Sequence, residues 1–432
     1  MGIIILGYIN TQPKNCNYNS YIAIIITLGY SIIYLFSNLY SNSLIINSLI
    51  SLLILGLTIY ILLQQNKPHT ENILCIMIIL ALIFLINSTN LFSLFLAIEL
   101  QAFCIYTLIS ISNNSLFSAE GALKYFLIGT IASALYILGV SLIYGNTGHL
   151  DLLIISDLKN NNLLFIIGST LIIISILFKV GAAPFHLWLP DAYQSASYEV
   201  LLFISIAPKI FLFLLLNTLT KSFSITPNYL VLTIILSAII GSIQAVQQLK
   251  IKRFLAYTII YNNAFFLAII LISGWMSFYI LMIAIILYLI GSILNLLPFW
   301  ALKTPYGNAF QSLRDFISLR TSNPWYSFIL IIGLFSSIGV PPLIGFFSKY
   351  FTFIALIEQN FIIVSLFLIV VTILPAYYYL RLTTILFFLP KSTRTFLIQT
   401  PHSLANTLSL LTILTLVFII YAPGVLTLFS IT

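Results

Sequence analysis

The sequence predicts an all-α protein that crosses a membrane many times. Hydrophobic residues make up 61% of the chain and charged residues only 6%, whereas a soluble domain carries about 25% charged residues. Apolar runs recur along the whole chain, and each is long enough to cross about 30 Å of hydrocarbon as a helix. The basic residues lie mostly in the short segments between these runs. This distribution is typical of a polytopic membrane protein.

The apolar runs predict about 13 transmembrane spans. They lie at 20–37, 43–63, 72–89, 91–111, 122–144, 163–194, 196–219, 228–247, 254–273, 276–299, 325–357, 361–388 and 404–427. Two of the longest carry prolines in the middle, in "GAAPFHLWLP" and "GVPPLIGFF". Because proline removes a backbone donor and clashes with the preceding turn, we expect both helices to be broken. A simple kink or a short loop is the alternative for each.

The charges between the runs predict how the spans face the two sides of the membrane. When the loops are assigned to the two sides alternately, one side receives Lys14, Lys67, Lys250, Lys252, Arg253, Lys303, Arg314, Arg320, Lys391 and Arg394, and the other receives only Lys159 and Lys221. Because Lys and Arg are retained on the inner side, we expect the N-terminus inside and, with an odd number of spans, the C-terminus outside. The net charge of +8 is accompanied by no nucleic-acid-binding motif, so no nucleic-acid partner is expected.

The cysteines and the N-terminus exclude some classes of protein. Cys16, Cys75 and Cys104 lack the spacing of a disulfide framework, a metal site or a CxxC redox motif, so we expect them to be packing residues. The N-terminus lacks the features of a signal peptide or a transit peptide. Heavy use of Ile, Leu, Asn, Phe and Tyr fits a chain encoded by an AT-rich organelle genome.

The order of the spans also predicts an internal repeat. Residues 72–219 and 228–388 each hold five spans, and in each group the fourth span is the one interrupted by proline. Each interrupted span carries a lysine, Lys179 or Lys349. Because five is odd, the two copies would lie in the membrane with opposite orientations, an arrangement that in transporters lines a water-filled path at the midplane. The remaining segments are the N-terminal spans at 1–71 and a C-terminal loop with the last span at 389–432.

Charged residues inside the spans are the candidate functional residues, because a charge at the centre of a membrane helix costs about 2.5–3.5 kcal/mol. The basic ones are Lys124, Lys179, Lys209, Lys349 and Arg381, and the acidic one is Glu99. Structural alternatives stay open: Glu99 as a packing residue neutralised by one basic neighbour, and Lys124 as a side chain that extends to the inner surface. Arg381 is expected to anchor its span.

Buried lysines of this kind can form a proton relay. The proton affinity of a buried ammonium depends on its burial and on any nearby carboxylate, so a change in a Glu–Lys distance can load or unload a proton. Lysines joined by water across the midplane would then pass protons. His186, in "APFHLW", is either a member of the relay or a cap of the broken helix. The sequence contains no GxGxxG after a strand, P-loop or HExxH motif that would indicate an enzyme active site.

Four segments resemble a known family: "LAIELQ", "FKVGAAPFHLWLPDAYQSA", "APKIFLF" and "VPPLIGFFSKYF". Together they closely resemble the antiporter-like proton-pumping subunits of respiratory complex I, and the resemblance extends from residue 70 to the end of the chain. Within that family, Tyr193 in "PDAYQ" and the lysine at position 349 are similar to the subunit 2 branch of mitochondrial NADH:ubiquinone oxidoreductase.

The resemblance implies a role for each site residue. Glu99 matches the family's glutamate, Lys124 a lysine on the next span, Lys179 the lysine of the first broken helix, Lys209 the central connecting lysine, and Lys349 the terminal lysine of the second broken helix. Two features depart from the family's pattern. Asn262 stands where a histidine is frequent, and the N-terminal part is shorter by one span.

The resemblance further implies proton translocation driven by NADH oxidation and quinone reduction in other subunits of an NADH:ubiquinone reductase. NADH, FMN, iron–sulfur clusters and ubiquinone would bind those other subunits, and no cofactor or metal is expected on this chain. The implied partners are other membrane-arm subunits, including another antiporter-like subunit and a small multi-span subunit, together with membrane lipids. The implied location is the mitochondrial inner membrane, with the N-terminus on the matrix side and the C-terminus in the intermembrane space. A cation/proton antiporter subunit and a structural membrane subunit without transport are the alternatives.

Overall fold

The computed structural model describes most of the chain after residue 68. The described ranges are 69–112, 115–158, 162–223, 228–272, 276–301, 310–317, 319–322, 324–388 and 408–418. The chain divides into two compact units, Met1–Cys75 and Ile76–Thr432, and the helices from α5 onward belong to the second. The spans expected at 20–37 and 43–63, and part of the one at 404–427, lie outside the described residues.

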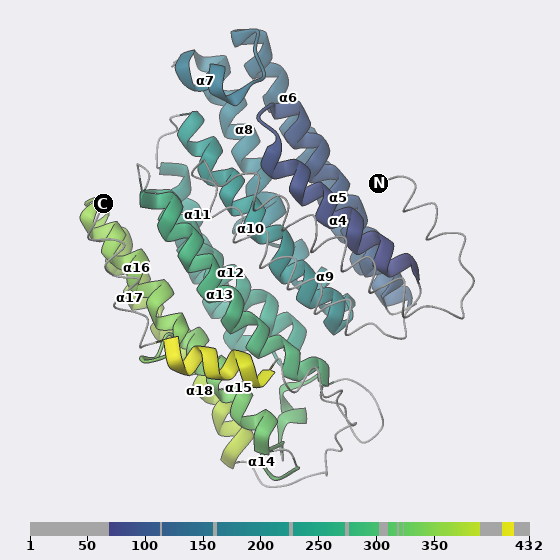
Figure 1. The fold of residues 1–432 in the computed structure, drawn as a ribbon, viewed down its shortest axis with the longest axis vertical. Coiled ribbons are helices and arrows are strands. Elements are labelled where there is room, and N and C mark those ends of the chain that lie inside the picture. Colours follow the sequence, from purple (N-terminus) through teal and green to yellow (C-terminus); the bar gives the residue numbers. More distant parts are fainter. Residues whose placement is uncertain are drawn as a thin grey trace. The chain divides into compact units, whose positions relative to one another are not determined.

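Helices make up nearly all of the described chain (Figure 1). They are α4 (His69–Asn87), α5 (Leu91–Ile111), α6 (Leu116–Thr147), α7 (Leu152–Leu158), α8 (Leu163–Val180), α9 (Trp188–Ser195), α10 (Tyr198–Ser222), α11 (Asn228–Gln247), α12 (Ile251–Ile270), α13 (Met276–Ala301), the 3₁₀ helix η1 (Leu313–Phe316), α14 (Leu319–Ser322), α15 (Pro324–Ile338), α16 (Ile344–Glu358), α17 (Ile362–Val371) and α18 (Ile373–Phe388). A further apolar helix covers Leu408–Phe418.

Eight of the described segments are long and apolar enough to cross a membrane. They are Leu91–Ile111, Leu116–Thr147, Leu163–Val180, Tyr198–Ser222, Tyr229–Gln247, Ile251–Ile270, Ile280–Trp300 and Ile362–Phe388. This confirms the all-α polytopic class. The larger total expected from the sequence stays a prediction.

The bounds of α6 differ from the expected span because of its N-cap. The helix begins at Leu116, before the apolar run at 122–144, since Ser115 caps it. The Ser118 backbone N–H donates to Ser115 Oγ, and the Ser115 N–H donates to Ser118 Oγ, each over 3.2 Å. This reciprocal pair satisfies donors that the first turn leaves unpaired. Lys124 therefore lies more than one turn inside the helix.

The structure has both expected breaks. α8 ends at Val180 and α9 begins at Trp188, and α15 ends at Ile338 before α16 begins at Ile344. Gly181 and Gly339 follow the two ends with φ of 74° and 92°, a left-handed conformation that glycine adopts without a Cβ clash. The Gly181 N–H donates to Leu177 O (3.0 Å) and the Gly339 N–H donates to Phe335 O (3.1 Å), so both helices end with the same hydrogen bond.

An unexpected interruption separates α17 from α18 within the span at 361–388. The two helices meet at Thr372, and Pro375 lies in the first turn of α18. Proline has no N–H to donate to the preceding turn. The sequence "VTILPAYYYL" carried this signal, but its single proline was less conspicuous than the glycine–proline groups of the other two breaks.

The two halves share backbone contacts at matching places. Just before α5, Asn90 pairs with Asp151 in the segment after α6, and just before α12, Lys250 pairs with Ser312 in the segment after α13. In each half the third helix also packs against both parts of the broken helix: α6 against α8 and α9, and α13 against α15 and α16. In the first half the start of α5 therefore lies on the same side of the membrane as the end of α6. In the second half the start of α12 lies on the same side as the end of α13.

Candidate functional site

Glu99 and Lys179 form an ion pair inside the first half. Glu99 lies in the middle of α5 and Lys179 in the last turn of α8. The distance between Lys179 Nζ and Glu99 Oε1 is 2.8 Å, and the two side chains are 6% and 14% exposed. Buried charges are tolerated when they are paired with good geometry. Removal of one partner destabilises the protein, because the other charge is then buried without compensation. The structure therefore brings together two residues that the sequence had marked separately.

Two side chains fix the end of α8 beside this pair. Trp188 Nε1 donates to Phe178 O over 2.9 Å, and Asn263 Nδ2, from α12, donates to Val180 O over 3.1 Å. The last carbonyls of a helix have no partner within it, so these donors hold the turn that carries Lys179. Sequence reasoning missed this capping role of Asn263, because the bond joins residues that are 83 positions apart in the sequence.

Lys209 is a buried ammonium on α10. Lys209 is 7% exposed, and its Nζ has no hydrogen-bond partner among the described residues. Nζ lies 5.9 Å from the centre of the Tyr193 ring, whose face attracts a cation. The Tyr193 hydroxyl is also buried without a partner in the described chain. Buried polar groups of this kind are usually satisfied by ordered water.

Lys349 is held by backbone carbonyls and aromatic rings. Its Nζ donates to Ser337 O (3.1 Å) and Ile338 O (2.6 Å) at the end of α15, where the helix dipole favours a positive charge. The Tyr261 and Phe265 rings each lie 5.5 Å from Nζ. Within the described residues Lys349 forms no ion pair. The lysines of the two broken helices are thus stabilised differently, Lys179 by a carboxylate and Lys349 by the end of its own interrupted helix.

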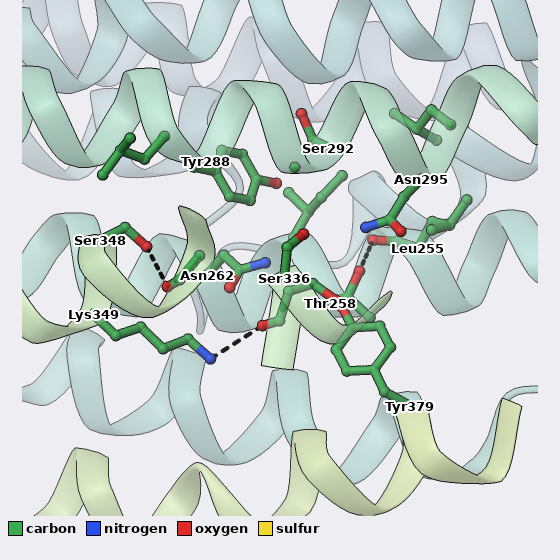
Figure 2. Close-up of a pocket in the computed structure, with 16 residues that line it drawn as sticks. Leu255, Thr258, Asn262, Tyr288, Ser292, Asn295, Ser336, Ser348, Lys349 and Tyr379 are labelled. Atoms are coloured by element: carbon green, nitrogen blue, oxygen red, sulfur yellow. Dashed lines mark hydrogen bonds between the residues drawn. The ribbon is translucent and has the colours of Figure 1, made fainter. Parts of the chain in front are cut away.

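A cavity of about 50 Å³ adjoins Lys349 (Figure 2). Its polar lining includes Thr258, Asn262, Tyr288, Ser292, Asn295, Ser336, Ser337, Ser348, Lys349 and Tyr379. A water needs about 10–15 Å³ of such space and a few polar partners, so several waters fit. The second half therefore contains a polar space beside its buried lysine.

Lys124 belongs to a different group of charges, which comes from three helices. It is 47% exposed, and its Nζ lies 2.8 Å from Glu120 Oε1 and 3.2 Å from Asp191 Oδ2. Asp191 in α9 also accepts from Arg253 in α12 over 2.5 Å. These four residues, here called the surface ion cluster, join α6, α9 and α12. Sequence reasoning marked Lys124 but did not mark Asp191 as its partner, and it counted Arg253 only as a loop charge.

The other marked residues lie at the edges of these groups. His186 lies in the turn between α8 and α9, 8% exposed, with its ring 6.5 Å from that of Tyr257. Arg381 is exposed and donates to Val246 O over 3.3 Å. Cys75 and Cys104 are buried free thiols. Among the described residues no group of His, Cys, Asp and Glu side chains could hold a metal ion.

Comparison with known proteins identifies the family. Residues 88–374 match the family model described as NADH:quinone oxidoreductase/Mrp antiporter, transmembrane. The chain belongs to this family. The matched segment contains Glu99, Lys179, Lys209 and Lys349. The resemblance seen in the sequence is thereby confirmed.

Similar proteins include a subunit of NADH-quinone oxidoreductase and chains of two solved complexes. The chain is 34% identical over 336 residues to NADH-quinone oxidoreductase subunit N of Coxiella burnetii, covering 75% of this chain and 70% of that protein. Its fold is similar to a chain of respiratory complex I from Thermus thermophilus with bound aureothin, with a TM-score of 0.84, 23% identity and coverage of 98% and 95%. A chain of the Mrp complex from Dietzia sp. DQ12-45-1b gives a TM-score of 0.69 with 21% identity and coverage of 81% and 68%.

Proposed function

We propose that this chain is a proton-translocating subunit of the membrane arm of respiratory complex I. It moves protons through its buried charged residues, while NADH oxidation and quinone reduction take place in other subunits. Family membership and the relatives named NADH-quinone oxidoreductase subunit N support this assignment. The chain contributes to NADH:quinone reductase activity through coupling and carries no redox centre of its own.

The buried Glu99–Lys179 pair is the observation that carries the proposal. At 2.8 Å, the carboxylate and the ammonium stabilise each other's charge. If α5 and α8 separate, the ammonium loses this stabilisation and can give up its proton to a neighbouring group or water. Because the pair lies where α8 is interrupted, a small movement of the helix end changes the distance. Lys179 thus has the means both to hold and to release a proton.

Lys209 and Lys349 extend the proposed relay. Each ammonium is removed from bulk water and lacks an acidic partner in the described chain. Such groups require water or carbonyl oxygens close by, and these can also carry protons. We expect Lys179, Lys209 and Lys349 to form one hydrated row near the middle of the membrane. Lys124, in the surface ion cluster, would connect the row to the inner surface. His186 would be a member of the relay between Lys124 and the row.

The predicted inverted repeat supports two access routes to this row. The bridges Asn90–Asp151 and Lys250–Ser312 occupy matching places in residues 72–219 and 228–388. The two broken helices also end with matching hydrogen bonds. Two copies with opposite orientations would expose their interrupted helices toward opposite sides.

The proposal also includes the membrane in which the chain lies, the orientation of its termini and its partner subunits. We propose the mitochondrial inner membrane, with the N-terminus in the matrix and the C-terminus in the intermembrane space. Basic loops on one side and the composition of the chain support this. The partners would be another antiporter-like subunit, a small multi-span subunit and membrane lipids. NADH, FMN, iron–sulfur clusters and ubiquinone would bind other subunits.

A second candidate is a subunit of a cation/proton antiporter, favoured by the similarity to a chain of the Mrp complex. Purification separates the two. The complex I assignment predicts that the chain, extracted in mild detergent, co-purifies with NADH dehydrogenase activity. Recovery in a complex that exchanges cations for protons without oxidising NADH would support the antiporter. A structural subunit without transport predicts that neutral substitutions at the buried lysines leave proton movement unchanged.

A further inference from the structure

Three consecutive tyrosines follow the interruption between α17 and α18, and the proposed relay does not use them. Tyr377 is 58% exposed, whereas Tyr378 and Tyr379 are 2% and 3% exposed. Consecutive residues of a helix point about 100° apart, so the last two tyrosines lie on the face that α18 turns toward the rest of the chain. A buried tyrosine hydroxyl usually has a hydrogen-bond partner. The partners of these hydroxyls therefore indicate what the group does.

The Tyr379 hydroxyl joins α18 to two other helices. It hydrogen-bonds with the side chains of Ser337, in the last turn of α15, and Thr258, on α12. The ring is held by the Phe254 and Tyr378 rings, whose centres lie 5.9 and 4.6 Å from its own. Figure 2 shows Tyr379 beside Thr258 in the lining of the cavity. Aromatic packing thus fixes the ring, and the hydroxyl contacts the end of α15.

Ser337 also supports Lys349, through a different atom. Its backbone carbonyl accepts from Lys349 Nζ over 3.1 Å, and the next carbonyl, Ile338 O, accepts over 2.6 Å. Both carbonyls lie at the end of α15, where no following turn of the helix supplies an N–H, and the chain then turns at Gly339 with φ of 92°. A side-chain bond at Ser337 is therefore a means of fixing the carbonyls that hold the ammonium.

The path of the span at 361–388 brings Tyr379 to this place. α17 packs against α16, whereas α18 packs against α15. The two helices meet at Thr372, and Pro375 in the first turn of α18 has no N–H to donate to the preceding turn. The two parts of this span thus follow the two parts of the second broken helix.

The tyrosine is a property of the second half alone. The fifth span of each half contains one proline, Pro208 or Pro375. Counted from these prolines, Tyr379 corresponds to Leu212 on α10, which has no hydroxyl. In the first half the end of α8 is held from α9 and α12 instead. Each half therefore fixes its interrupted helix with different residues.

We propose that Tyr379 is a positioning residue for proton exchange at Lys349. Its hydroxyl fixes Ser337, and Ser337 keeps the two carbonyls of α15 within reach of the ammonium. Without the hydroxyl the end of α15 can move, and the charged form of Lys349 loses these acceptors. Tyr379 acts through Ser337 and carries no proton itself. This inference rests on the proposed function, because it concerns the lysine of the second broken helix.

Tyr379→Phe tests the proposal, because phenylalanine keeps the ring and removes only the hydroxyl. NADH-driven pumping is measured in vesicles with equal amounts of assembled complex. We expect it to fall roughly two- to tenfold, the factor that corresponds to the loss of one hydrogen bond. The KM for quinone, whose binding site is expected on another subunit, should not change. The matched control is Tyr377→Phe, which removes an exposed hydroxyl from the same helix and should pump at the wild-type rate.

Ser337→Ala distinguishes positioning from packing. If Tyr379 acts through Ser337, this variant lowers pumping by a similar factor, and the double variant pumps no less than either single one. Multiplied losses in the double variant would overturn the proposal, as would equal pumping in Tyr379→Phe and Tyr377→Phe.

A second comparison applies should Tyr379→Phe fail to assemble. Ser337→Ala is then compared with Ser327→Ala on the same helix, whose hydroxyl donates to Pro324 O. We expect lower pumping in Ser337→Ala, and equal pumping in the two would overturn the proposal.

Lys349→Met, measured in parallel, separates this inference from the proposed function. We expect both Lys349→Met and Tyr379→Phe to pump less than Tyr377→Phe. Loss of pumping in Lys349→Met but not in Tyr379→Phe would refute only the positioning role. Normal pumping in Lys349→Met would remove this lysine from the relay and would overturn the inference with it.

Discussion

Lys179 Nζ, on α8, lies 2.8 Å from Glu99 Oε1, on α5. The pair is buried, and α8 ends directly after Val180. An ion pair fixed on two continuous helices would be rigid. Here one partner is on the last turn of an interrupted helix, whose position depends on the bonds from Trp188 and Asn263. The position of Lys179 relative to Glu99 therefore depends on these two bonds.

Glu99→Gln should lower both proton pumping and the coupled NADH:quinone reductase activity. The neutral amide leaves the Lys179 ammonium without its counter-charge, which favours the deprotonated lysine. We expect a loss on the order of tenfold, corresponding to about 1.4 kcal/mol. Pumping is measured in vesicles as acidification per NADH oxidised. Glu358→Gln, at the exposed end of α16, is the control, and equal pumping in the two variants would make Glu99 a packing residue.

Asn263→Leu should destabilise the protein more than Trp188→Phe. The leucine removes the donor to Val180 O, and a buried carbonyl left unpaired costs about 1–3 kcal/mol. In Trp188→Phe the ring still stacks on Tyr125, and Phe178 O keeps the bond from the Gly181 N–H. Thermal unfolding of the detergent-solubilised complex measures the difference. If Asn263→Leu unfolds at the wild-type temperature, the cap does not hold the end of α8.

Asp191→Asn should loosen the surface ion cluster. Asp191 accepts from both Lys124 and Arg253, whereas Lys124 keeps Glu120 as a second partner. Exposed ion pairs contribute little to stability and are screened by salt. We therefore expect a modest fall in melting temperature that is larger at low ionic strength. Glu120→Gln, which leaves both bonds of Asp191 intact, should have a smaller effect, and the reverse order would contradict the assignment.

The topology predicts opposite exposure of two loops. The loop at 300–324 and the N-terminus should face the matrix, and the loop at 145–162 and the C-terminus the intermembrane space. Within the loop at 145–162 Asp151 pairs with Asn90 before α5, and within the loop at 300–324 Ser312 pairs with Lys250 before α12. Protease digestion of mitoplasts and of inverted vesicles measures the exposure. Cleavage of both loops from one side would refute the predicted orientation.

The positions of the helices could be predicted from the sequence because apolar runs fix them directly. α5 and α11 have the bounds expected from hydrophobicity, and glycine–proline groups marked both breaks. Buried charges were marked by the same logic, since each stands out in an apolar run. Hydropathy did not reveal the cap at Ser115 or the interruption near Pro375, because both depend on hydrogen bonding within a single turn.

Partners across the fold could not be predicted. Asp191 and Arg253 are 62 residues apart in the sequence, and Asn263 and Val180 are 83 apart. Only helix packing brings them together. The hydrogen bonds from Lys349 to backbone carbonyls could not be predicted either. Several carbonyl oxygens are unpaired at a helix break, and the sequence does not indicate which of them a lysine contacts. Interrupted helices offer such oxygens, which is a general reason to examine lysines near breaks.

Proton pumping by Lys209→Met tests the relay most directly. Lys209 is the buried lysine between the two broken helices in sequence, and methionine has a similar length and suits an apolar helix. The matched control is Lys221→Met, at the exposed end of the same helix. In vesicles with equal amounts of assembled complex, we expect Lys209→Met to lose NADH-driven pumping while Lys221→Met retains it. Pumping by Lys209→Met at the control level would show that protons do not pass through the buried lysines.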